Sequence, residues 1–410
     1  MSYPYVLLGD YIDILSGFAF KSKYFSENGI PVIKIKNIVP PYVTLEDLSY
    51  VPNEIAKSNQ KYLLTYNDVL IALTGSHINQ MASVVGRIAR VKYNIPSLLN
   101  QRVGKITVKN EGSCDINYVY YFLSQEQIKI ALASKAGGAA NQANISPSDI
   151  KKLIIPLPPI EIQRRIADIL SAYDDLIENN RKQIKLLEEA AQRLYQEWFV
   201  DLRFPGHKHT KIVDGVPEGW ESCVLDDVIE FDPKICLDKD RIKQFVPMSA
   251  LSTSSMVLDV NKISDTTSNS GSKFQNGDTL LARITPCLEN GKTAFVHGLE
   301  SDEGTVGSTE YIVMRSKKLN PYMVYLLSRT NSFRQSAINS MSGSDGRQRV
   351  KADKLKALVY LLPPAELIHS FEQMVSPMFE KVFALNQQIF AATQARDRLL
   401  PKLMSGEVDV

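Results

Sequence analysis

Several features that would identify a common class of protein are missing or scarce in these 410 residues. The chain has only four cysteines, at positions 114, 223, 236 and 287, and no C-x-x-C pair. That pattern excludes the usual zinc and dithiol redox spacings, so we expect buried free thiols. His207 and His209 have no nearby cysteine or carboxylate to complete a metal site, and we interpret their segment as a solvated linker.

Long apolar runs are also missing. No run approaches the roughly 20 residues that span a bilayer, and the first 20 residues have no basic region before their apolar stretch, as a signal peptide would. We therefore expect a cytoplasmic protein with no membrane contact. The hydrophobic content of 44% and charged content of 22% are typical of globular proteins. The length suits two globular domains and an additional extended part.

Charge of one sign is not abundant. A net charge of +2 counts mildly against a dedicated nucleic-acid domain, which is often more basic. The distribution is uneven, however. Residues 1–155 contain 16 Lys and Arg against 11 Asp and Glu, whereas residues 156–204 contain 7 against 9. An electrostatic footprint for DNA would therefore belong to the globular part.

Catalytic motifs are missing too. The sequence has no G-x-x-x-x-G-K-[ST] phosphate loop, no G-x-G-x-x-G fingerprint and no nucleophile elbow. The segment from Val39 to Tyr42 reads V-P-P-Y and is similar to the N/D-P-P-Y box of amino-methyltransferases, but valine cannot accept a hydrogen bond from a target amine. We predict no catalytic residue and no cofactor bound by this chain.

What the sequence does contain is a repeat. Residues 154–199 and 359–404 resemble each other at an offset of 205, and the Pro-Pro pair at 158–159 coincides with the pair at 363–364. After each pair, apolar residues recur in steps that alternate between four and three. This period predicts two long helices whose apolar seams pack on another helix, most simply on each other. The apolar seam positions are Ile166, Leu170, Ile177, Ile184, Leu187 and Leu194 in the first helix and Phe371, Val375, Val382, Leu385, Ile389 and Leu399 in the second.

The repeat extends upstream of both helices. LGDYIDI at 8–14 resembles LDDVIEF at 225–231, and NDVLIALTG at 67–75 resembles GDTLLARIT at 277–285. The unit is thus a globular domain followed by a long helix, used twice. We expect domains at 1–155 and 205–361, the second with a leading linker, and long helices within 156–204 and 362–410.

Short β-rich runs dominate each globular part, which predicts an α+β fold. Strands are expected at 31–39, 68–74, 102–108, 278–284 and 309–315, with helical segments at 116–134 and 320–340. The Gly-rich segments at 137–138 and 343–346 follow the helical segments and are interpreted as C-terminal caps that lead into exposed loops.

Polar, donor-rich loops recur at matching places, just before each long-helix segment. Asn, Gln and Arg side chains can bind base edges in DNA, although a plain solvated loop would have a similar composition. The candidates are Asn141, Gln142 and Asn144 in the first copy and Ser344, Arg347, Gln348 and Arg349 in the second.

A second candidate region follows the strand pair in each copy. It contains Thr74, Ser76, His77, Asn79 and Gln80 in the first copy and Arg283, Thr285 and Lys292 in the second. The residue types differ between the copies, which would correspond to different base sequences. Lys34 and Lys36, like Arg87 and Lys105, are candidates for phosphate contacts, which position a protein without specifying sequence. For each of them a plain surface cation is an equally good interpretation.

The chain resembles the DNA-specificity (S) subunits of type I restriction-modification enzymes. The residues that support the resemblance are ISPSDIKKLIIPLPPIEIQRRIADILSAYDDLIENNRKQIKLLEEAAQRLYQEWF, the opening LGDYIDILSGFAF, the phrase VPEGW and the C-terminal LLPKLMSGEVDV. The resemblance implies two target recognition domains, separated by an antiparallel coiled coil, that read the two halves of an asymmetric, split site in double-stranded DNA. It also implies two methyltransferase (M) subunits and restriction (R) subunits as partners. These partners would use the S-adenosylmethionine, Mg²⁺ and ATP, and this chain would be non-catalytic.

The second copy departs from the first in its helix. Ile368 takes the place of Gln163, Arg396 replaces Ala191 on the seam, and Pro401 is expected to bend or end the helix. We therefore expect the second helix to be shorter or more irregular. Two other functions stay open at this stage: a coiled-coil scaffold that binds only protein, and a self-sufficient DNA methyltransferase or nuclease whose site has no recognised motif.

Overall fold

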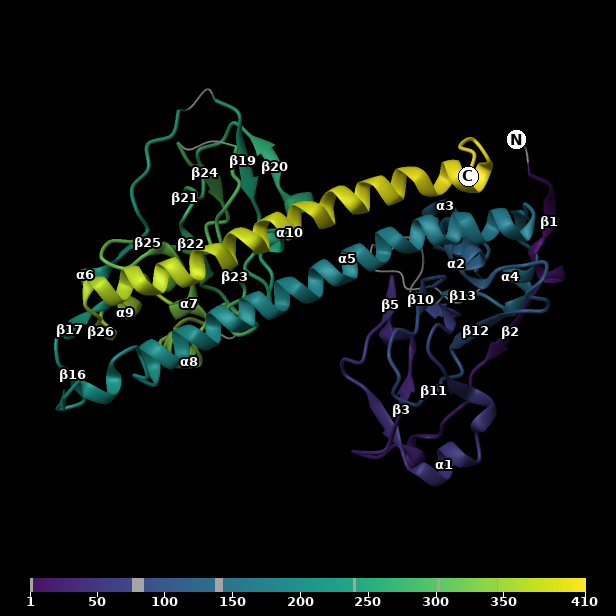
Figure 1. The fold of residues 1–410 in the computed structure, drawn as a ribbon, viewed down its shortest axis with the longest axis horizontal. Helices are drawn as coiled ribbons and strands as arrows, with labels where there is room; N and C mark the ends of the chain where they lie inside the picture. The colour runs from purple at the N-terminus through teal and green to yellow at the C-terminus, as the bar shows by residue number, and fades with distance from the viewer. Residues whose placement is uncertain (1–2, 76–84, 137–142, 239–240, 301–302, 345) are drawn as a thin grey trace. The chain divides into compact units, whose positions relative to one another are not determined.

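The computed structural model describes residues 3–75, 85–136, 143–238, 241–300, 303–344 and 346–410 (Figure 1). The chain divides into two compact units. Unit 1 comprises Met1–Ile177 and Ala391–Val410, and unit 2 comprises Glu178–Phe390. Each unit therefore contains one β-rich part together with a segment of both long helices.

Unit 1 is built on two sheets. The larger has the strand order β2-β12-β8-β10-β5-β4, and the smaller has the order β6-β3-β11-β7. Two further pairs, β1 with β14 and β9 with β13, join segments that are distant in sequence. The strands are β1 (Tyr5–Leu7), β2 (Ile12–Ser16), β3 (Ile30–Ile33), β4 (Ile38–Val39), β5 (Tyr42–Val43), β6 (Ser49–Val51), β7 (Leu63–Leu64), β8 (Val69–Ala72), β9 (Thr74–Gly75), β10 (Ile88–Arg90), β11 (Ser97–Leu99), β12 (Val103–Val108), β13 (Ala143–Asn144) and β14 (Ile154–Pro156).

Four short helices complete unit 1: α1 (Asn53–Lys57), α2 (Ile116–Ser124), α3 (Glu126–Ser134) and α4 (Pro147–Lys151). The carboxylate of Asp115 begins α2 by accepting a hydrogen bond from the Tyr118 amide at 2.9 Å, as an N-cap residue does. Gln125 is extended and separates α2 from α3. The helical segment expected at 116–134 is thus a pair of helices.

Unit 2 repeats this plan with different strand lengths. Its two sheets have the orders β18-β25-β22-β23 and β20-β19-β24-β21, and β17 pairs with β26 as β1 pairs with β14. The strands are β15 (Ile212–Val213), β16 (Val216–Pro217), β17 (Glu221–Val224), β18 (Ile229–Phe231), β19 (Lys243–Val246), β20 (Ser264–Thr266), β21 (Ser272–Phe274), β22 (Thr279–Ala282), β23 (Thr293–Phe295), β24 (Thr305–Gly307), β25 (Tyr311–Ser316) and β26 (Val359–Leu362).

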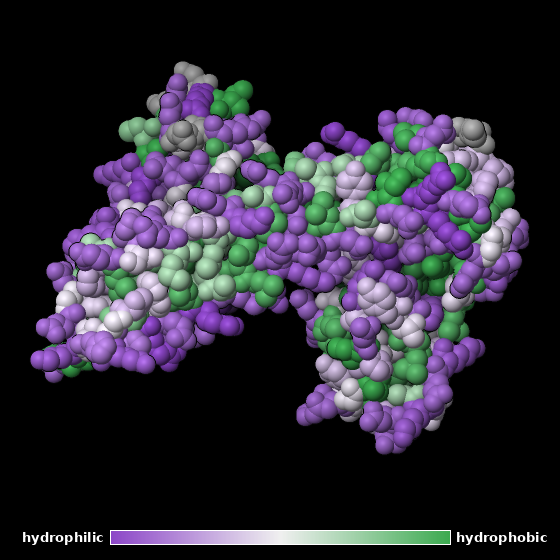
Figure 2. Space-filling view, in the orientation of Figure 1, coloured by the Kyte–Doolittle hydropathy of each residue, from purple (hydrophilic) through white to green (hydrophobic). Residues whose placement is uncertain are grey.

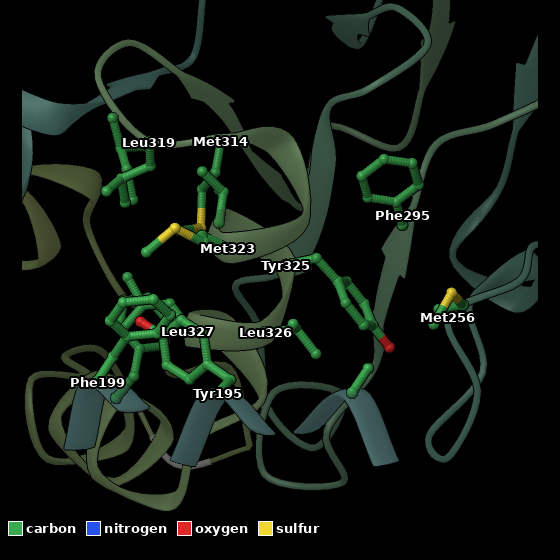
Figure 3. Packing of buried hydrophobic residues seen from close by; sticks show 14 of the residues in the cluster. Tyr195, Phe199, Met256, Phe295, Met314, Leu319, Met323, Tyr325, Leu326 and Leu327 are labelled. Atoms are coloured by element: carbon green, nitrogen blue, oxygen red, sulfur yellow. The ribbon is translucent and has the colours of Figure 1, made fainter. Parts of the chain in front are cut away.

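The short helices of unit 2 are α6 (Leu225–Val228), α7 (Pro321–Arg329), α8 (Asn331–Asn339) and α9 (Ala352–Lys356). Asn320 and Thr330 cap α7 and α8, each by accepting a backbone N–H bond. The core of the unit includes Tyr195 and Phe199 together with Leu326 of α7 (Figure 3). The end of the first long helix is therefore part of a globular core.

The first long helix, α5 (Ile160–Tyr195), begins directly after the Pro-Pro pair and continues as one π-helical turn over Gln196–Val200. Its start is fixed to unit 1 by a fully buried amide. Gln163 Oε1 accepts from the Asp115 amide at 2.9 Å, and Gln163 Nε2 donates to the carbonyl oxygen of Pro158 at 2.8 Å. At 1.5 Å per residue, the 36 residues of α5 are about 54 Å long.

The second long helix, α10 (Ala365–Ser405), packs antiparallel to α5 within each unit. In unit 1 the Arg396 guanidinium of α10 contacts the Asp174 carboxylate of α5 at 2.7 Å. In unit 2 Asn180 Nδ2 donates to Gln388 Oε1 at 3.1 Å, and the rings of Tyr195 and Phe371 lie 6.0 Å apart. Residues with higher numbers on α5 thus contact residues with lower numbers on α10, as expected for antiparallel helices. All twelve apolar positions predicted for the seams are buried or half-buried, and their individual seam roles stay predictions.

Four expectations about local structure are wrong. The second helix is not shorter, because α10 has 41 residues and continues for four residues after Pro401, whose ring is exposed in the last turns. The strand expected at 31–39 is broken by a 3-10 turn at Ile35–Asn37, where the Asn37 side chain accepts from the Lys34 amide at 3.0 Å. Gly343 does not cap α8, because Ser340 holds that position. Of the four cysteines only Cys114 is buried, and Cys236 is exposed.

The α+β prediction with two packed long helices is confirmed. The compact units each combine sheets, short helices and antiparallel segments of α5 and α10. Among the described residues, none of the helices is both long and apolar enough to span a bilayer.

Candidate nucleic-acid interface

In unit 1 the two candidate regions meet at one small β-ladder. Strand β9 contains Thr74, the first candidate of the region that follows the strand pair. It pairs antiparallel with β13, so that Thr74 lies opposite Asn144. The Ile145 amide donates to the Leu73 carbonyl oxygen at 2.9 Å and continues the ladder. Thr74 is buried, whereas Asn144 is exposed. Two segments that are about 70 residues apart in the chain therefore lie side by side.

Unit 2 joins its two candidate regions in the same way. Ile284 forms an antiparallel bridge with Arg349, and the Thr285 amide donates to the Gln348 carbonyl oxygen at 3.1 Å. The Val350 amide donates to the Arg283 carbonyl oxygen at 2.9 Å, as Ile145 does to Leu73 in unit 1. The pairing makes Leu73 equivalent to Arg283 and Asn144 equivalent to Arg349. The fold therefore repeats this meeting point and changes the side chains on it.

Arg349 is held by a carboxylate from the neighbouring strand. Its Nε lies 2.9 Å and its Nη2 2.7 Å from the oxygens of Glu310, while Nη1 donates to the Arg347 carbonyl oxygen at 3.2 Å. The hydrogen bonds from Arg349 hold the pKa of the Glu310 carboxyl below its usual value, against the opposing effect of burial. This fork-to-carboxylate geometry fixes both side chains.

The other candidates of unit 2 surround this pair. Ser344 and Arg347 are exposed in the segment between Ser342 and Arg349, and the backbones of these two residues exchange two hydrogen bonds. Arg283 is half-buried and, among the described residues, its Nε has no hydrogen-bond acceptor. Thr285 Oγ1 donates to Glu289 Oε1 at 3.2 Å across the next turn.

Lys292 is engaged within unit 2. Its Nζ donates to the Met248 carbonyl oxygen at 2.9 Å. The loop before it is held by two arginines of the helix pair: Arg329 Nη1 donates to the Gly291 carbonyl oxygen at 2.8 Å, and Arg334 Nη2 to that of Glu289 at 2.9 Å. This loop is therefore supported by α7 and α8.

Lys34 and Lys36 lie elsewhere in unit 1, around the 3-10 turn at Ile35–Asn37. Lys34 Nζ donates to Ser49 Oγ at 2.8 Å and lies 4.0 Å from the centre of the Phe25 ring. Burial, and then the charge of Lys36, lowers the pKa of Lys34. Lys36 forms an ion pair with Asp47. Both lysines therefore already have polar partners within the protein, and a DNA contact by either stays a prediction.

Several candidates cannot be placed. Ser76, His77, Asn79, Gln80, Asn141 and Gln142 lie outside the described residues. The residues on either side of them are described, however, and these are the ones that pair in the β9–β13 ladder.

The sequence reasoning did not single out Arg102 and Glu310. The carbonyl oxygen of Arg102 accepts a hydrogen bond from the Leu73 amide at 2.9 Å, and that of Glu310 accepts one from the Arg283 amide at 3.0 Å. Arg102 and Glu310 are therefore structurally equivalent. Each lies within the segment predicted as a strand at 102–108 or 309–315, just before the observed strand β12 or β25. Aligning those two strands, at an offset of 208, would have found the pair.

The described residues contain no group of three or more His, Cys, Asp and Glu side chains that could hold a metal ion. The chemistry that these meeting points do offer is hydrogen bonding by amide, hydroxyl and guanidinium groups. Of the described candidates, Asn144 in unit 1 and Ser344 and Arg347 in unit 2 are exposed, and amide and guanidinium groups can bind base edges.

Comparison with known proteins agrees with this chemistry. The type I restriction-modification DNA specificity domain matches residues 3–189. The MjaIX specificity subunit of Methanocaldococcus jannaschii is 28% identical over 313 residues, which cover 72% of this chain and 69% of that protein. The StySPI specificity subunit of Salmonella potsdam is 20% identical over 411 residues, which cover 96% of this chain and 87% of that protein.

The fold is also similar to that of a solved structure, the type I restriction-modification S subunit from M. genitalium. The TM-score is 0.62 at 15% identity, over 98% of this chain and 96% of that chain. The likeness covers the whole architecture, a doubled α+β unit with two long packed helices. The chain belongs to the specificity (S) subunits of type I restriction-modification systems, and as such it is itself non-catalytic.

Proposed function

We propose that this specificity subunit recognises an asymmetric DNA site in two separated parts, one with each unit. One observation carries the proposal. The same antiparallel pairing joins the two candidate regions in both units, but the equivalent positions carry Leu73, Arg102 and Asn144 in unit 1 and Arg283, Glu310 and Arg349 in unit 2. Equivalent scaffolds with different hydrogen-bonding groups suit two different base sequences.

The candidate contacts are divided between the two units. Unit 1 would read its half-site with the exposed Asn144 and with the neighbouring candidates that lie outside the described residues, whereas Thr74 is buried and would support them. Unit 2 would use Arg283, Arg347 and Gln348. Lys34 and Lys36 would hold phosphates, and this requires that they exchange their present partners for DNA.

The partners follow from the family. Two methyltransferase subunits would bring S-adenosylmethionine, and restriction subunits would bring ATP-driven cleavage, all in the cytoplasm. Mg²⁺ would also be used by these partner subunits. Figure 2 shows apolar areas among the hydrophilic surface of the molecule. Several large apolar side chains on the long helices remain exposed, which supports docking of a protein. They are Ile169, Leu176 and Leu186 on α5 and Met374 and Phe390 on α10.

The test is a map of methylated positions in DNA treated with the chain and its methyltransferase partner. We expect methylation only at sites with two fixed half-sequences at one fixed separation. Methylation without sequence preference would contradict the proposal. If the chain alone, with Mg²⁺ and labelled S-adenosylmethionine, modified or cut DNA, it would be a self-sufficient enzyme. If the complex gave no salt-dependent shift of duplex DNA, the scaffold function would be favoured instead.

A further inference from the structure

The equivalent residues Arg102 and Glu310 carry opposite charges at the same place in the fold. Each follows a loop and precedes the long central strand, β12 in unit 1 and β25 in unit 2. Each also accepts a backbone hydrogen bond from the residue that directly follows β8 or β22, Leu73 or Arg283. Both positions therefore adjoin the meeting point of the two loops.

In unit 2 the Glu310 carboxylate binds the guanidinium group of Arg349. Glu310 binds Arg349 through Nε and Nη2, and the remaining nitrogen, Nη1, donates to the Arg347 carbonyl oxygen. Since each of the three guanidinium nitrogens already has an acceptor, Arg349 holds the turn in shape. The exposed side chain of Arg347 is left to contact a ligand.

Unit 1 has the reverse arrangement. Asn144 replaces Arg349, and the side chain of Arg102, which replaces Glu310, is exposed and donates no hydrogen bond to any described residue. The equivalent positions 73, 102 and 144 carry one positive charge. Positions 283, 310 and 349 in unit 2 carry two positive charges and one negative charge. The net charge of the three positions is the same in both units. In unit 1, however, the positive charge lies just before β12, at the position that Glu310 holds in unit 2.

We propose that Arg102 reads a guanine in the half-site of unit 1, and that Glu310 is the positioning residue that replaces this contact in unit 2. The inference rests on the proposed function and assigns to it a specificity-determining residue. The planar guanidinium fork of arginine matches the O6 and N7 acceptors of guanine in the major groove. The exposed guanidinium of Arg102 next to the β9–β13 ladder offers that geometry in unit 1.

The experiment compares full-length variants reconstituted with the methyltransferase partner. Arg102→Ala should lose the preference for guanine at one position of one half-site and weaken binding of the cognate duplex by roughly 5- to 150-fold. The other half-site should be unchanged. Arg102→Lys keeps the charge without the fork, so it should also relax that position. Lys57→Ala, which removes an exposed cation from α1 in the same unit, is the matched control and should leave the methylation map unchanged.

A second variant addresses Glu310. Glu310→Gln removes the charge that holds Arg349 and should change the preference in the half-site of unit 2 only. Because both altered side chains are partly or fully exposed, circular dichroism should show unchanged folding.

The outcomes separate this inference from the proposed function. If the wild-type complex methylates a split site and Arg102→Ala gives the same map and affinity, the assignment of Arg102 is wrong and the proposed function stands. If Arg102→Ala weakens all sequences alike and lowers the salt slope by about one, Arg102 contacts a phosphate and the base-reading role is wrong. If the wild-type complex shows no split site, both proposals fail.

Discussion

Arg90 and Asp174 form an ion pair at 2.7 Å in which both side chains are almost completely buried, with exposed fractions of 2% and 1%. Arg90 ends β10 and Asp174 lies on α5, so the pair ties the larger sheet of unit 1 to the long helix. The carboxylate also accepts from Arg396 of α10 at 2.7 Å and from the Tyr121 hydroxyl at 2.6 Å. The buried Asp174 carboxylate thus connects α5 with β10, α2 and α10.

Removing this anion should destabilise unit 1 strongly. Asp174→Ala leaves the buried Arg90 guanidinium without its counter-charge, a change that typically costs about 3–5 kcal/mol, whereas Arg396 keeps its ion pair with Asp397. The two tryptophans of the chain, Trp198 and Trp220, are both buried in unit 2. We therefore expect the urea transition seen by circular dichroism to move to lower denaturant while the tryptophan fluorescence transition stays in place.

The control for this variant is Asp175→Ala, which removes an exposed carboxylate from the next position of the same helix. It should change the free energy of unfolding by less than about 0.5 kcal/mol. Equal stability of the two variants would show that the buried pair contributes nothing to the attachment of α5.

A half-buried carboxyl in unit 2 should make stability depend on pH. Glu188 Oε1 accepts from the Met256 amide at 2.7 Å and from Ser255 Oγ at 2.8 Å. Burial raises the pKa of Glu188 above its ordinary value of 4.5, although these hydrogen bonds act in the opposite direction. Because the folded state then holds the proton more tightly than the unfolded state, stability is lost as the pH rises from about 4.5 through the folded pKa.

The isosteric variant tests this dependence. Glu188→Gln keeps an oxygen acceptor and cannot ionise, so the tryptophan-monitored transition should depend less on pH above about 4.5 and be at least as stable at neutral pH. Glu188→Ala leaves the Met256 amide without its acceptor and should lose about 1–3 kcal/mol. A Gln variant with the full pH dependence of wild type would contradict the role of Glu188.

The pattern of the chain predicted its local structure well where one physical rule governed it. The alternation of four and three predicted both long helices because their apolar faces repeat regularly from Ile166 to Leu194. Pro401 misled the prediction because a missing N–H and a bulky ring are tolerated on an exposed face one turn before a helix ends. The turn at Ile35–Asn37 is held in part by the Asn37 side chain, which accepts from the Lys34 amide and donates to the Glu46 carbonyl oxygen, and no periodicity encodes these contacts.

The contacts that position the site could not be predicted in the same way. Arg90, Asp174 and Arg396 are separated by 84 and 222 residues, so nothing local connects them. Arg102 and Glu310 escaped notice because loops of different length shift the offset of the repeat from 205 to 208. Only the pairing of strands shows that an arginine in one unit replaces a glutamate in the other.

The first half of the chain should form a dimer when it is made alone. Unit 1 completes its core with Leu400, Leu403 and Met404 of α10. At the repeat offset of 205, these correspond to Tyr195, Trp198 and Phe199 at the end of α5. In a chain of residues 1–204, a second copy can therefore supply an aromatic set where α10 is missing, in an arrangement with twofold symmetry.

Light scattering after size-exclusion chromatography checks the mass of this half-length chain. We expect twice the chain mass, and with the methyltransferase partner a palindromic split site in the methylation map. Trp198→Glu should give a monomer because it places a charge in the shared core. Arg193→Glu, at an exposed position of the same helix, should leave the dimer intact. An asymmetric methylation map would count against the twofold arrangement.

Lengthening both long helices should lengthen the spacer between the half-sites, if α5 and α10 determine how far apart the units read DNA. Inserting three heptads after Ile177 and three after Phe390 places the new residues at the limits of the units, so the contacts within each unit are kept. Twenty-one residues add about 32 Å of helix, which is about nine base pairs at 3.4 Å each. This is close to one turn of DNA, so both half-sites would still face the protein.

The measurement is again the methylation map of the reconstituted complex. We expect the same two half-sequences with a spacer about nine base pairs longer. Insertion into α5 alone is the control, and it should abolish methylation because the paired seams no longer match in length. If the doubly lengthened chain methylates the original site with its original spacer, the helices do not determine the separation, and the distance between half-sites must be fixed by the partner subunits instead.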